Sequence, residues 1–203
     1  TEMNISDMKY YTFQKGVFAG KENVLISTTG YTGAGGFEIY FKNEDAEVIW
    51  NAIFEAGKDC NITPVGLAAR DTLRLEMGFC LYGNDIDDTT SPLEAGLGWI
   101  TKFTNDFVDS DYLQKQKEAG ITKRLVGFEL IDRGVPRHGY DVVNEAGDKI
   151  GNVTSGTMAP SLKKAIGLAY IPKDMTAPGT EIFIAVRKKQ LKAKVVALPF
   201  YKA

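Results

Sequence analysis

Short runs of alternating apolar and polar residues open the chain and predict a small sheet. Val17 to Thr28 and Phe37 to Phe41 have the composition of strands. The segment between them is rich in glycine, which adopts positive φ angles without steric cost. Its glycines are Gly30, Gly33, Gly35 and Gly36. We therefore expect two strands joined by a turn whose backbone a ligand can approach closely.

The next segments have the spacing of helices. After Asn43, which suits an N-cap, apolar residues recur at steps of three and four, as an amphipathic helix requires. They are Ala46, Ile49, Trp50, Ile53 and Phe54. A second helix is expected from Pro64 to about Met77, and Gly78 can end it in a left-handed conformation. The first of these helices should cover one face of the sheet.

The last part of the chain has the pattern of an all-β domain. A short helix, capped by Ser110 and ended by Gly120, precedes it. Beyond Thr122, short apolar runs alternate with Gly, Pro, Asn or Asp turns. The predicted strands are Lys123 to Leu130, Asp141 to Asn144, Lys149 to Thr154, Lys164 to Tyr170, Glu181 to Val186 and Gln190 to Leu198. This spacing favours a compact antiparallel barrel or sandwich, so the fold class is α+β with an all-β second part.

Composition limits the class of protein. With 203 residues, 44% of them hydrophobic and 25% charged, the chain can form one large globular domain or two small ones. No stretch approaches the roughly 18 consecutive apolar residues of a membrane span, and no signal-peptide pattern opens the chain. The net charge of −2 gives no broad attraction to nucleic acid, so we expect neither nucleic acid nor a membrane as a partner. The basic run Arg187 to Lys194 alternates after Gln190 and favours a solvated hairpin over a nucleic-acid patch.

Cysteine and histidine are scarce. Cys60 and Cys80 are the two cysteines and His138 is the single histidine, too few for a zinc site with the usual paired spacing. A disulfide scaffold is not expected either, which favours a reducing compartment. A cysteine–histidine catalytic pair would require the fold to bring His138 to one of the two thiols.

Three aspartates, Asp85, Asp87 and Asp88, lie close together in the sequence. Such a cluster invites a divalent-metal interpretation, but it lacks the spacing of a calcium loop and the closing glutamate. We therefore interpret the segment as a solvated or backbone-capping loop and expect no metal. The turn from Gly30 to Gly36 also fails the dinucleotide and phosphate-loop patterns, which argues against phosphate binding there.

Two charged residues stand among apolar and glycine residues, where an unpaired charge is costly. Glu38 points to the opposite face of its strand from Phe37 and Ile39, and faces either solvent or a ligand. Arg70 shares a helix face with Arg74. It either forms an internal ion pair or offers its planar fork to a carboxylate or carbonyl of a ligand. The candidate ion-pair partners are Asp71, Asp85 and Glu94.

The start of the chain predicts a fragment. No initiator methionine stands at position 1, and the strand-like aromatic run Tyr10 to Phe13 follows almost at once. We expect the preceding part of the protein to hold part of the site.

Five segments together resemble one family, the folate-dependent aminomethyltransferases known as the T-protein of the glycine cleavage system. They are Gly30 to Glu38, Gly66 to Glu76, Tyr82 to Ile86, Gly151 to Gly156 with Pro160 and Leu162, and Pro199 to Tyr201. The resemblance covers essentially the whole chain. It implies that residues 1–105 are the C-terminal part of an α+β folate-binding region, that 106–121 are a helical connector, and that 122–203 are a C-terminal antiparallel β-barrel domain.

The activity that the resemblance implies is one-carbon transfer. Proteins similar to this one take an aminomethyl group from the dihydrolipoyl arm of the lipoylated H-protein, release ammonia and deliver the carbon to tetrahydrofolate as its 5,10-methylene derivative. Tetrahydrofolate is then the acceptor substrate, and no metal takes part. The chemistry needs a desolvated pocket that holds folate N5 against the aminomethyl carbon.

The resemblance also implies site residues. Glu38 matches the glutamate that binds folate, because one ionised carboxylate can accept adjacent N–H donors of the pterin ring together. Arg70 matches the folate-binding arginine, and Tyr31 matches an aromatic position near the folate, where it either stacks on a ring or only packs. Tyr201, or Lys202 beside it, matches a C-terminal ligand residue, and we take Tyr201. The family's catalytic aspartate lies in the missing part, so no catalytic residue is expected here and the chain alone should be inactive.

Two other functions use the same modules. In dimethylglycine and sarcosine dehydrogenases they capture a carbon that a flavin domain releases, but this chain has no flavin-binding sequence. Related non-catalytic folate-binding scaffolds support iron–sulfur cluster assembly and carry a Lys-Gly-Cys-Tyr segment, whereas this chain has Gly78-Phe-Cys80-Leu-Tyr82. The departure favours the transferase, in a bacterial cytoplasm or a mitochondrial matrix.

Overall fold

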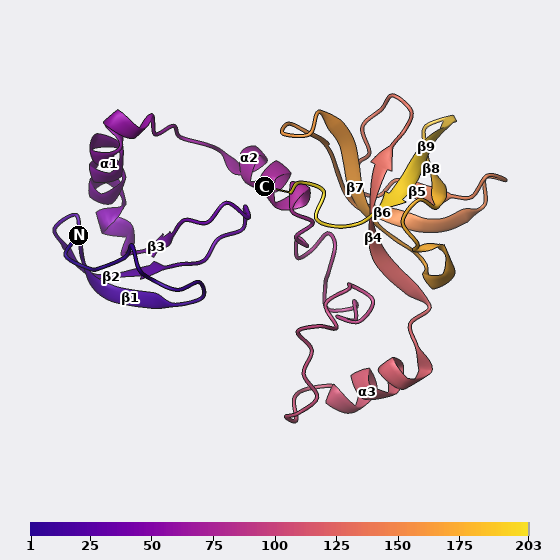
Figure 1. Ribbon diagram of the computed structural model, residues 1–203, viewed down its shortest axis with the longest axis horizontal. Helices are drawn as coiled ribbons and strands as arrows, with labels where there is room; N and C mark the ends of the chain where they lie inside the picture. The colour runs from indigo at the N-terminus through magenta and orange to yellow at the C-terminus, as the bar shows by residue number, and fades with distance from the viewer. Residues whose placement is uncertain (203) are drawn as a thin grey trace. The chain divides into compact units, whose positions relative to one another are not determined.

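The computed structural model describes residues 1–202, and these form two compact units. The first spans Thr1–Arg70 and the second begins at Asp71. Each unit has its own β-sheet (Figure 1). The expected α+β class with a C-terminal barrel is confirmed. No helix among the described residues has the length and apolar character that a membrane span requires.

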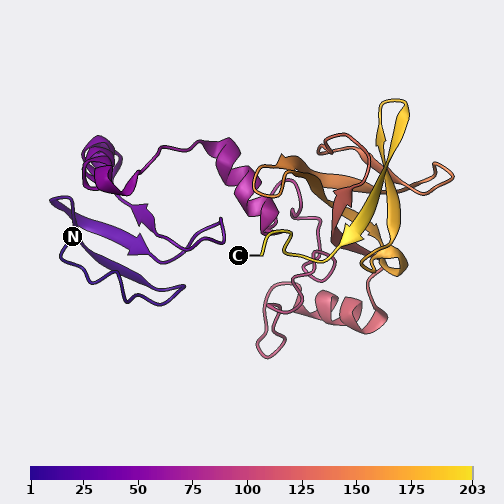
Figure 2. The same ribbon diagram turned by 45° about the horizontal axis from the view of Figure 1, so that its top comes forward.

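The first unit is a three-stranded antiparallel sheet with one helix packed on it. Its strands, paired in the order β1-β2-β3, are β1 (Phe13–Phe18), β2 (Lys21–Ser27) and β3 (Glu38–Tyr40). A 3₁₀ turn, η1 (Asn43–Asp45), leads into helix α1 (Ala46–Ala56), which Figure 2 shows on one face of the sheet. Val24 and Ile26 of β2 are buried against Ile49 of α1 and form the small core of this unit.

The prediction of a single strand from Val17 to Thr28 is wrong, because a turn interrupts it. Ala19 and Gly20 have φ angles of 52° and 73°, and the chain reverses there between β1 and β2. A left-handed alanine carries no sequence signal comparable to that of glycine. The start of the first helix also differs, because Asn43 lies in η1 and Asp45 is the N-cap residue of α1.

Helix α2 (Leu67–Glu76) follows a second 3₁₀ turn, η2 (Lys58–Cys60), and contains residues of both units. It begins three residues after Pro64, which was the expected start. Gly78 has a φ of 70° just beyond its end, as expected. Only the second half of the helix enters a core, since Leu75 is 1% exposed and Leu67 is 82% exposed.

The second unit contains α3 (Ser110–Ala119) and a closed barrel of six antiparallel strands. The strands are β4 (Lys123–Leu130), β5 (Asp141–Val143), β6 (Lys149–Ala159), β7 (Lys164–Pro172), β8 (Glu181–Val186) and β9 (Lys189–Val196), with a 3₁₀ turn, η3 (Lys173–Met175), before β8. They pair in the order β4-β7-β6-β5-β8-β9, and β9 pairs with β4 to close the barrel. Closure leaves no free strand edge on this sheet.

The sequence located each barrel strand. β4 and β8 have the predicted bounds, whereas β6 continues beyond Thr154 to Ala159. At α3, Ser110 is the first helical residue and Asp109 is the N-cap residue, so the cap was misplaced by one position. The predicted helix end is confirmed, because Gly120 follows with a φ of 82°.

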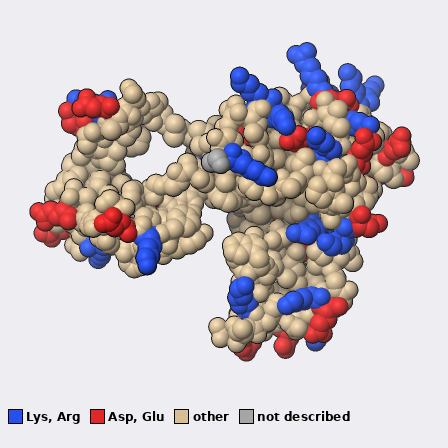
Figure 3. Space-filling model, viewed as in Figure 1, with Lys and Arg blue, Asp and Glu red and all other residues tan. Residues whose placement is uncertain are grey.

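The basic run that starts at Arg187 forms the hairpin between β8 and β9, as predicted. Its charges are partly neutralised within the barrel: Lys192 pairs with Glu181, and Lys194 with Glu129. Figure 3 shows Lys and Arg side chains interspersed with Asp and Glu over the barrel unit. The barrel surface in this view is therefore of mixed charge.

Apolar side chains fill the barrel from several strands. Phe128 of β4, Ile182 and Ile184 of β8 and Val195 of β9 are at most 1% exposed. A second buried cluster packs Leu75 of α2 against residues of three strands. Those residues are Leu125 of β4, Ala159 of β6, and Ile166 and Leu168 of β7. The end of α2 is thus part of the barrel's own core.

Replacing Phe128 tests this core. Phe128→Ala should lower the free energy of unfolding of the barrel by about 3–5 kcal/mol, because the side chain is fully buried and its loss leaves a cavity. Met158→Ala, on β6 and 47% exposed, is the control and should cost less than about 1 kcal/mol. Urea unfolding followed through amide exchange of the barrel strands measures both. Equal losses would contradict the assignment of Phe128 to the core.

Candidate functional site

Glu38 begins strand β3 and presents a partly satisfied carboxylate. It lies opposite Ser27 of β2, on the sheet face away from α1. Its Oε2 atom accepts hydrogen bonds from the hydroxyl groups of Thr29 and, at 3.4 Å, of Tyr40. Its Oε1 atom accepts none from residues 1–202. Residues 1–202 therefore orient this carboxylate through one oxygen and give the other no hydrogen bond.

A small cavity lies against the glycine-rich loop that precedes β3. Tyr10, Gly30, Gly33 and Gly35 line it. Its volume is about 210 Å³, below the roughly 300–1,000 Å³ of a pocket that encloses a drug-sized ligand. Partial burial, followed by Tyr11 and the charge of Glu38, raises the pKa of Tyr10. The cavity can therefore hold part of a larger ligand within reach of the Glu38 charge.

Arg70 contacts an aromatic ring. Its guanidinium carbon lies 4.4 Å from the centroid of the Tyr31 ring, which is a cation–π contact. The ion-pair alternative is wrong for Arg70, because no carboxylate of residues 1–202 pairs with it. Two of the partners considered for it, Asp71 and Asp85, bind Arg74 instead. Arg70 is exposed, and its guanidinium has the planar donor geometry that a carboxylate or carbonyl can accept.

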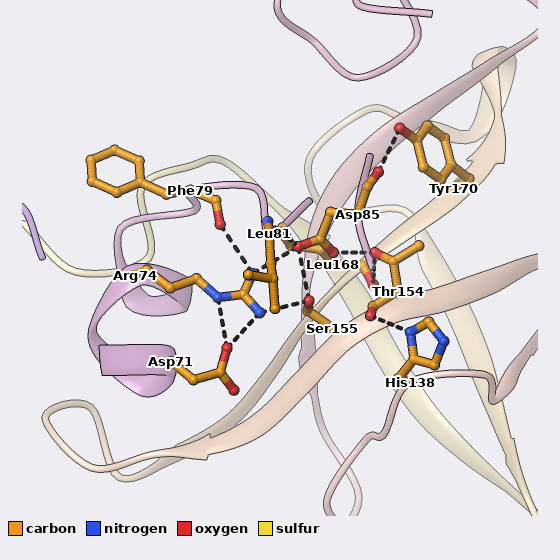
Figure 4. A network of polar contacts seen from close by, with 10 residues as sticks. All are labelled: Asp71, Arg74, Phe79, Leu81, Asp85, His138, Thr154, Ser155, Leu168 and Tyr170. Atoms are coloured by element: carbon orange, nitrogen blue, oxygen red, sulfur yellow. Dashed lines mark hydrogen bonds and ion pairs between the residues drawn. The ribbon is translucent and has the colours of Figure 1, made fainter. Parts of the chain in front are cut away.

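A buried ion pair stands at the centre of a polar network in the second unit (Figure 4). Arg74 and Asp85 are each 1% exposed, and Arg74 Nη1 lies 2.7 Å from Asp85 Oδ2. Arg74 Nε and Nη2 donate to Asp71 Oδ1 at 2.8 and 2.7 Å. Nη1 also donates to the carbonyl of Phe79 at 3.0 Å, and Nη2 to Ser155 Oγ at 2.9 Å. All five N–H groups of the arginine therefore have an acceptor.

Asp85 is satisfied just as fully. Its Oδ2 atom also accepts from the backbone N–H of Leu81 at 2.8 Å and from the hydroxyl of Ser155 at 2.9 Å. Its Oδ1 atom accepts from the hydroxyl of Thr154, whose carbonyl accepts from His138 Nδ1 at 2.7 Å. Thr154 and Ser155 both belong to β6. The ion pair thus joins α2, the loop after it and a barrel strand.

The network sets the charge state of its neighbours. Burial lowers the pKa of Arg74, but the hydrogen bonds and charges of Asp71 and Asp85 outweigh this effect, and the pKa is raised. Burial, followed by the charge of Asp85, raises the pKa of Cys80 to about 11. A thiol that stays neutral at pH 7 is a poor nucleophile. Cys80 therefore lacks the activation that a cysteine–histidine pair requires.

In the acidic loop that contains Asp85, Asp87 and Asp88, the side chain of Asp87 caps the backbone. Its Oδ1 atom accepts from the backbone N–H of Thr89 at 2.9 Å and from the hydroxyls of Thr89 and Thr90, both at 2.7 Å. These hydrogen bonds, led by that of Thr89, lower the pKa of Asp87. The backbone-capping interpretation is confirmed here, whereas Asp85 is buried in the ion pair. Within residues 1–202, no three His, Cys, Asp or Glu side chains are grouped to hold a metal ion.

Tyr201 is anchored through its backbone. Its N–H donates to the carbonyl of Glu76, the last residue of α2, at 2.9 Å. Glu76 is itself buried, and its Oε1 atom accepts from the backbone N–H of Ser161 at 2.9 Å. The side chain of Tyr201 stays 39% exposed. Of the predicted site residues, Glu38, Tyr31 and Arg70 belong to the first unit and Tyr201 to the second.

Sequence reasoning missed the residues that support this site. Arg74 was noted only as the neighbour of Arg70, and Ser155 only as part of a segment. The signal available was a second arginine one turn along an apolar helix face, which needs a buried acceptor. Thr29 and Tyr10, which surround Glu38, carried no signal beyond their nearness to the glycine-rich turn.

Comparison with known proteins identifies two matching family models. Residues 1–105 match the GCVT N-terminal domain. Residues 123–202 match the glycine cleavage T-protein C-terminal barrel domain. The second match coincides with the closed barrel.

The curated relatives and a solved structure that resemble this chain are aminomethyltransferases. The aminomethyltransferases of Flavobacterium psychrophilum and Bacteroides thetaiotaomicron are 63% and 62% identical to the whole of this chain. The chain spans 56% of the length of each. The crystal structure of the glycine cleavage system aminomethyltransferase T from Bartonella henselae superposes with a TM-score of 0.87 at 32% identity, over 96% of this chain and 53% of that one.

Removing the buried carboxylate tests the network. Asp85→Ala should lower the free energy of unfolding of the second unit by about 3–5 kcal/mol, because Arg74 keeps a buried charge without its counter-ion. Asp88→Ala changes an exposed aspartate of the same loop and should stay within about 0.5 kcal/mol. Urea unfolding of the two variants measures the difference. A loss at Asp85 no larger than at Asp88 would mean that the pair is not buried in solution.

The thiol of Cys80 should resist alkylation until high pH. Its pKa of about 11 lies above the ordinary value of 9.0, so the neutral form is favoured in the folded state. The corresponding stabilisation is present below pH 9.0 and is lost as the pH rises toward 11. Iodoacetamide labelling from pH 7 to 11, read at each cysteine by mass spectrometry, should modify the exposed Cys60 first. Equal labelling of both thiols at pH 8 would refute this.

Proposed function

This chain belongs to the glycine cleavage T-protein family, and from that premise we propose that it carries the tetrahydrofolate-binding part of an aminomethyltransferase. The reaction moves the aminomethyl carbon from the dihydrolipoyl arm of the lipoylated H-protein to tetrahydrofolate. Ammonia leaves, and 5,10-methylenetetrahydrofolate forms. The named relatives, aminomethyltransferases of similar sequence, support this assignment.

The observation that carries the proposal is the half-satisfied carboxylate of Glu38. Thr29 and Tyr40 hold its Oε2 atom, so the group is oriented before a ligand arrives. The pterin ring of folate presents adjacent N–H donors, which an ionised carboxylate accepts with charge-assisted hydrogen bonds. The neighbouring cavity of about 210 Å³ can take part of the ligand and leaves the rest outside. Glu38 thereby fixes one end of the folate.

Arg70 and Tyr31 bind a second part of the folate. The guanidinium rests on the Tyr31 ring, so its side chain is already ordered and less conformational entropy is lost on binding. Its N–H groups donate to the pterin carbonyl or to the carboxylates of the glutamyl tail. Tyr201, held at the end of α2 by its backbone N–H, supplies a further contact.

The chain contributes binding and orientation, while the catalytic aspartate comes from elsewhere. Holding folate N5 against the aminomethyl carbon replaces a bimolecular encounter by a positioned one. Exclusion of water protects the aminomethyl carbon from hydrolysis while its bond to the dihydrolipoyl sulfur breaks and its bond to folate N5 forms. Residues 1–105 form the folate-binding part, 106–121 the helical connector and 122–203 the barrel domain. The setting is a bacterial cytoplasm, in line with the bacterial origin of the relatives.

The decisive experiment is anaerobic calorimetric titration of this chain with tetrahydrofolate. Saturable binding is expected, and its absence would contradict the proposal that the folate site lies in this part. A product assay with aminomethylated H-protein complements it. This chain alone should form no 5,10-methylenetetrahydrofolate, whereas a longer natural polypeptide that contains it should. Product formation by neither would overturn the proposed transferase activity.

Glu38→Gln should weaken tetrahydrofolate binding by about 1.5–3 kcal/mol, the scale of a hydrogen bond to a charged group. That loss corresponds to at least about a tenfold rise in Kd. Glu22→Gln, at an exposed position of β2 in the same sheet, removes the same charge and serves as the control. The same calorimetric titration measures both variants. An unchanged Kd in Glu38→Gln would remove this residue from the site.

A further inference from the structure

The second half of helix α2 is fixed to the barrel at three points. Arg74 Nη2 donates to Ser155 Oγ of β6 at 2.9 Å. The carboxylate of Glu76 accepts from the backbone N–H of Ser161, in the turn between β6 and β7. Leu75 packs in the barrel's second apolar cluster. The last turn of α2 is therefore held to the barrel by the polar contacts of Arg74 and Glu76 and by the apolar contact of Leu75 between them. We call these three contacts the clamp.

In the ion pair of Arg74 and Asp85, which belongs to this clamp, every hydrogen-bonding group already has a partner. Every N–H group of Arg74 and both oxygens of Asp85 are engaged, as Figure 4 shows. Ser155 Oγ accepts from Arg74 and donates to Asp85, so its single hydroxyl links both charges to β6. No buried side-chain polar atom of residues 1–202 lacks a partner. A fully satisfied buried network tolerates no alternative packing without leaving a group unpaired.

The first half of α2 has no such clamp. Leu67 is 82% exposed, and Arg70 is exposed as well. Arg70 lies one turn before Arg74 on the same helix, about 6 Å along its axis at 1.5 Å per residue. Because helix formation is cooperative, loss of order in one turn of this ten-residue helix weakens the adjacent turn. The order of the helical turn that carries Arg70 therefore depends on how firmly the next turn, at Arg74, is held.

We propose that Ser155 is a positioning residue for Arg70: by holding Arg74 and Asp85 on strand β6, it keeps the second half of α2 ordered and thereby the helical turn that carries the arginine that binds folate. The inference rests on the proposed function, in which Arg70 contacts tetrahydrofolate. Ser155 touches no ligand in this account and acts only through the helix. A buried ion pair contributes little net stability compared with apolar packing, whereas a fixed helix has a direct consequence for binding.

The first test needs no ligand. Ser155→Ala removes one hydroxyl and keeps the ion pair, and Thr157→Ala removes a hydroxyl from the same strand outside the network. Amide hydrogen exchange in residues 67–76 should accelerate about tenfold in Ser155→Ala and stay unchanged in Thr157→Ala. Exchange in strands β4 and β8 reports on the barrel and should stay near the wild-type rate. Unchanged exchange in α2 of Ser155→Ala would overturn the proposal.

The second test is a double-mutant cycle in tetrahydrofolate affinity. With Arg70 present, Ser155→Ala should raise Kd about three- to tenfold, while Thr157→Ala leaves it unchanged. In an Arg70→Ala background, the effect of Ser155→Ala should vanish, because no arginine remains to be positioned. An equal loss in both backgrounds would show that Ser155 acts on binding without Arg70 and would overturn the proposal.

The folate site and the positioning role of Ser155 are contradicted by different results. If Glu38→Gln and Arg70→Ala both leave Kd unchanged, the proposed folate site fails, and the role of Ser155 fails with it. If both weaken binding but Ser155→Ala does not couple to Arg70, only the positioning role is overturned. Coupling between Ser155 and Arg70 in Kd, together with faster amide exchange in α2 of Ser155→Ala, would support both the folate site and the positioning role.

Discussion

The arrangement of the second unit depends on the buried ion pair of Arg74 with Asp85. Both charges lie out of water, so each needs compensation at every polar atom. Asp71, Ser155 and Thr154 provide it, together with backbone groups of the intervening loop. The contacts come from a helix, a loop and a barrel strand. Satisfying two charges therefore forces three distant parts of the sequence into one arrangement.

The barrel makes that arrangement possible because it is closed. A sheet without free edges offers a fixed frame, and β6 presents adjacent hydroxyl groups toward the ion pair at Thr154 and Ser155. On this frame sit the end of α2 and the chain terminus, which meet where Tyr201 donates to Glu76. The candidate ligand-binding residues Glu38, Tyr31 and Arg70 belong to the first unit. Glu38 begins β3, Tyr31 lies in the glycine-rich loop and Arg70 is on α2.

The candidate site combines an oriented carboxylate with an ordered arginine. Glu38 is held by two hydroxyls, and Arg70 rests on the ring of Tyr31. Both groups are arranged in the absence of a ligand, which lowers the entropic cost of binding. Under the proposed function, these two groups complement the hydrogen-bonding ring and the anionic tail of folate.

Much of this protein could be predicted from its sequence, because local patterns determine local structure. The alternation of apolar and polar residues located the six barrel strands, and β4 and β8 have the predicted bounds. Helix α1 followed from the spacing of its apolar residues. The prediction failed between β1 and β2, where Ala19 takes a conformation that the neighbouring strands impose. The motifs around Glu38 and Arg70 marked the ligand-binding candidates.

Only the tertiary structure decided which arginine of α2 is internal. Arg70 and Arg74 share a helix face and look alike in the sequence. Arg74 is distinguished by its acceptors, of which Asp71 and Asp85 are near in sequence and Ser155 on β6 is 81 residues away. Sequence determines which groups need partners, because charge and hydrogen-bonding capacity are properties of single residues. Which partner each group finds depends on how distant elements pack, and that is decided by the burial of the whole core.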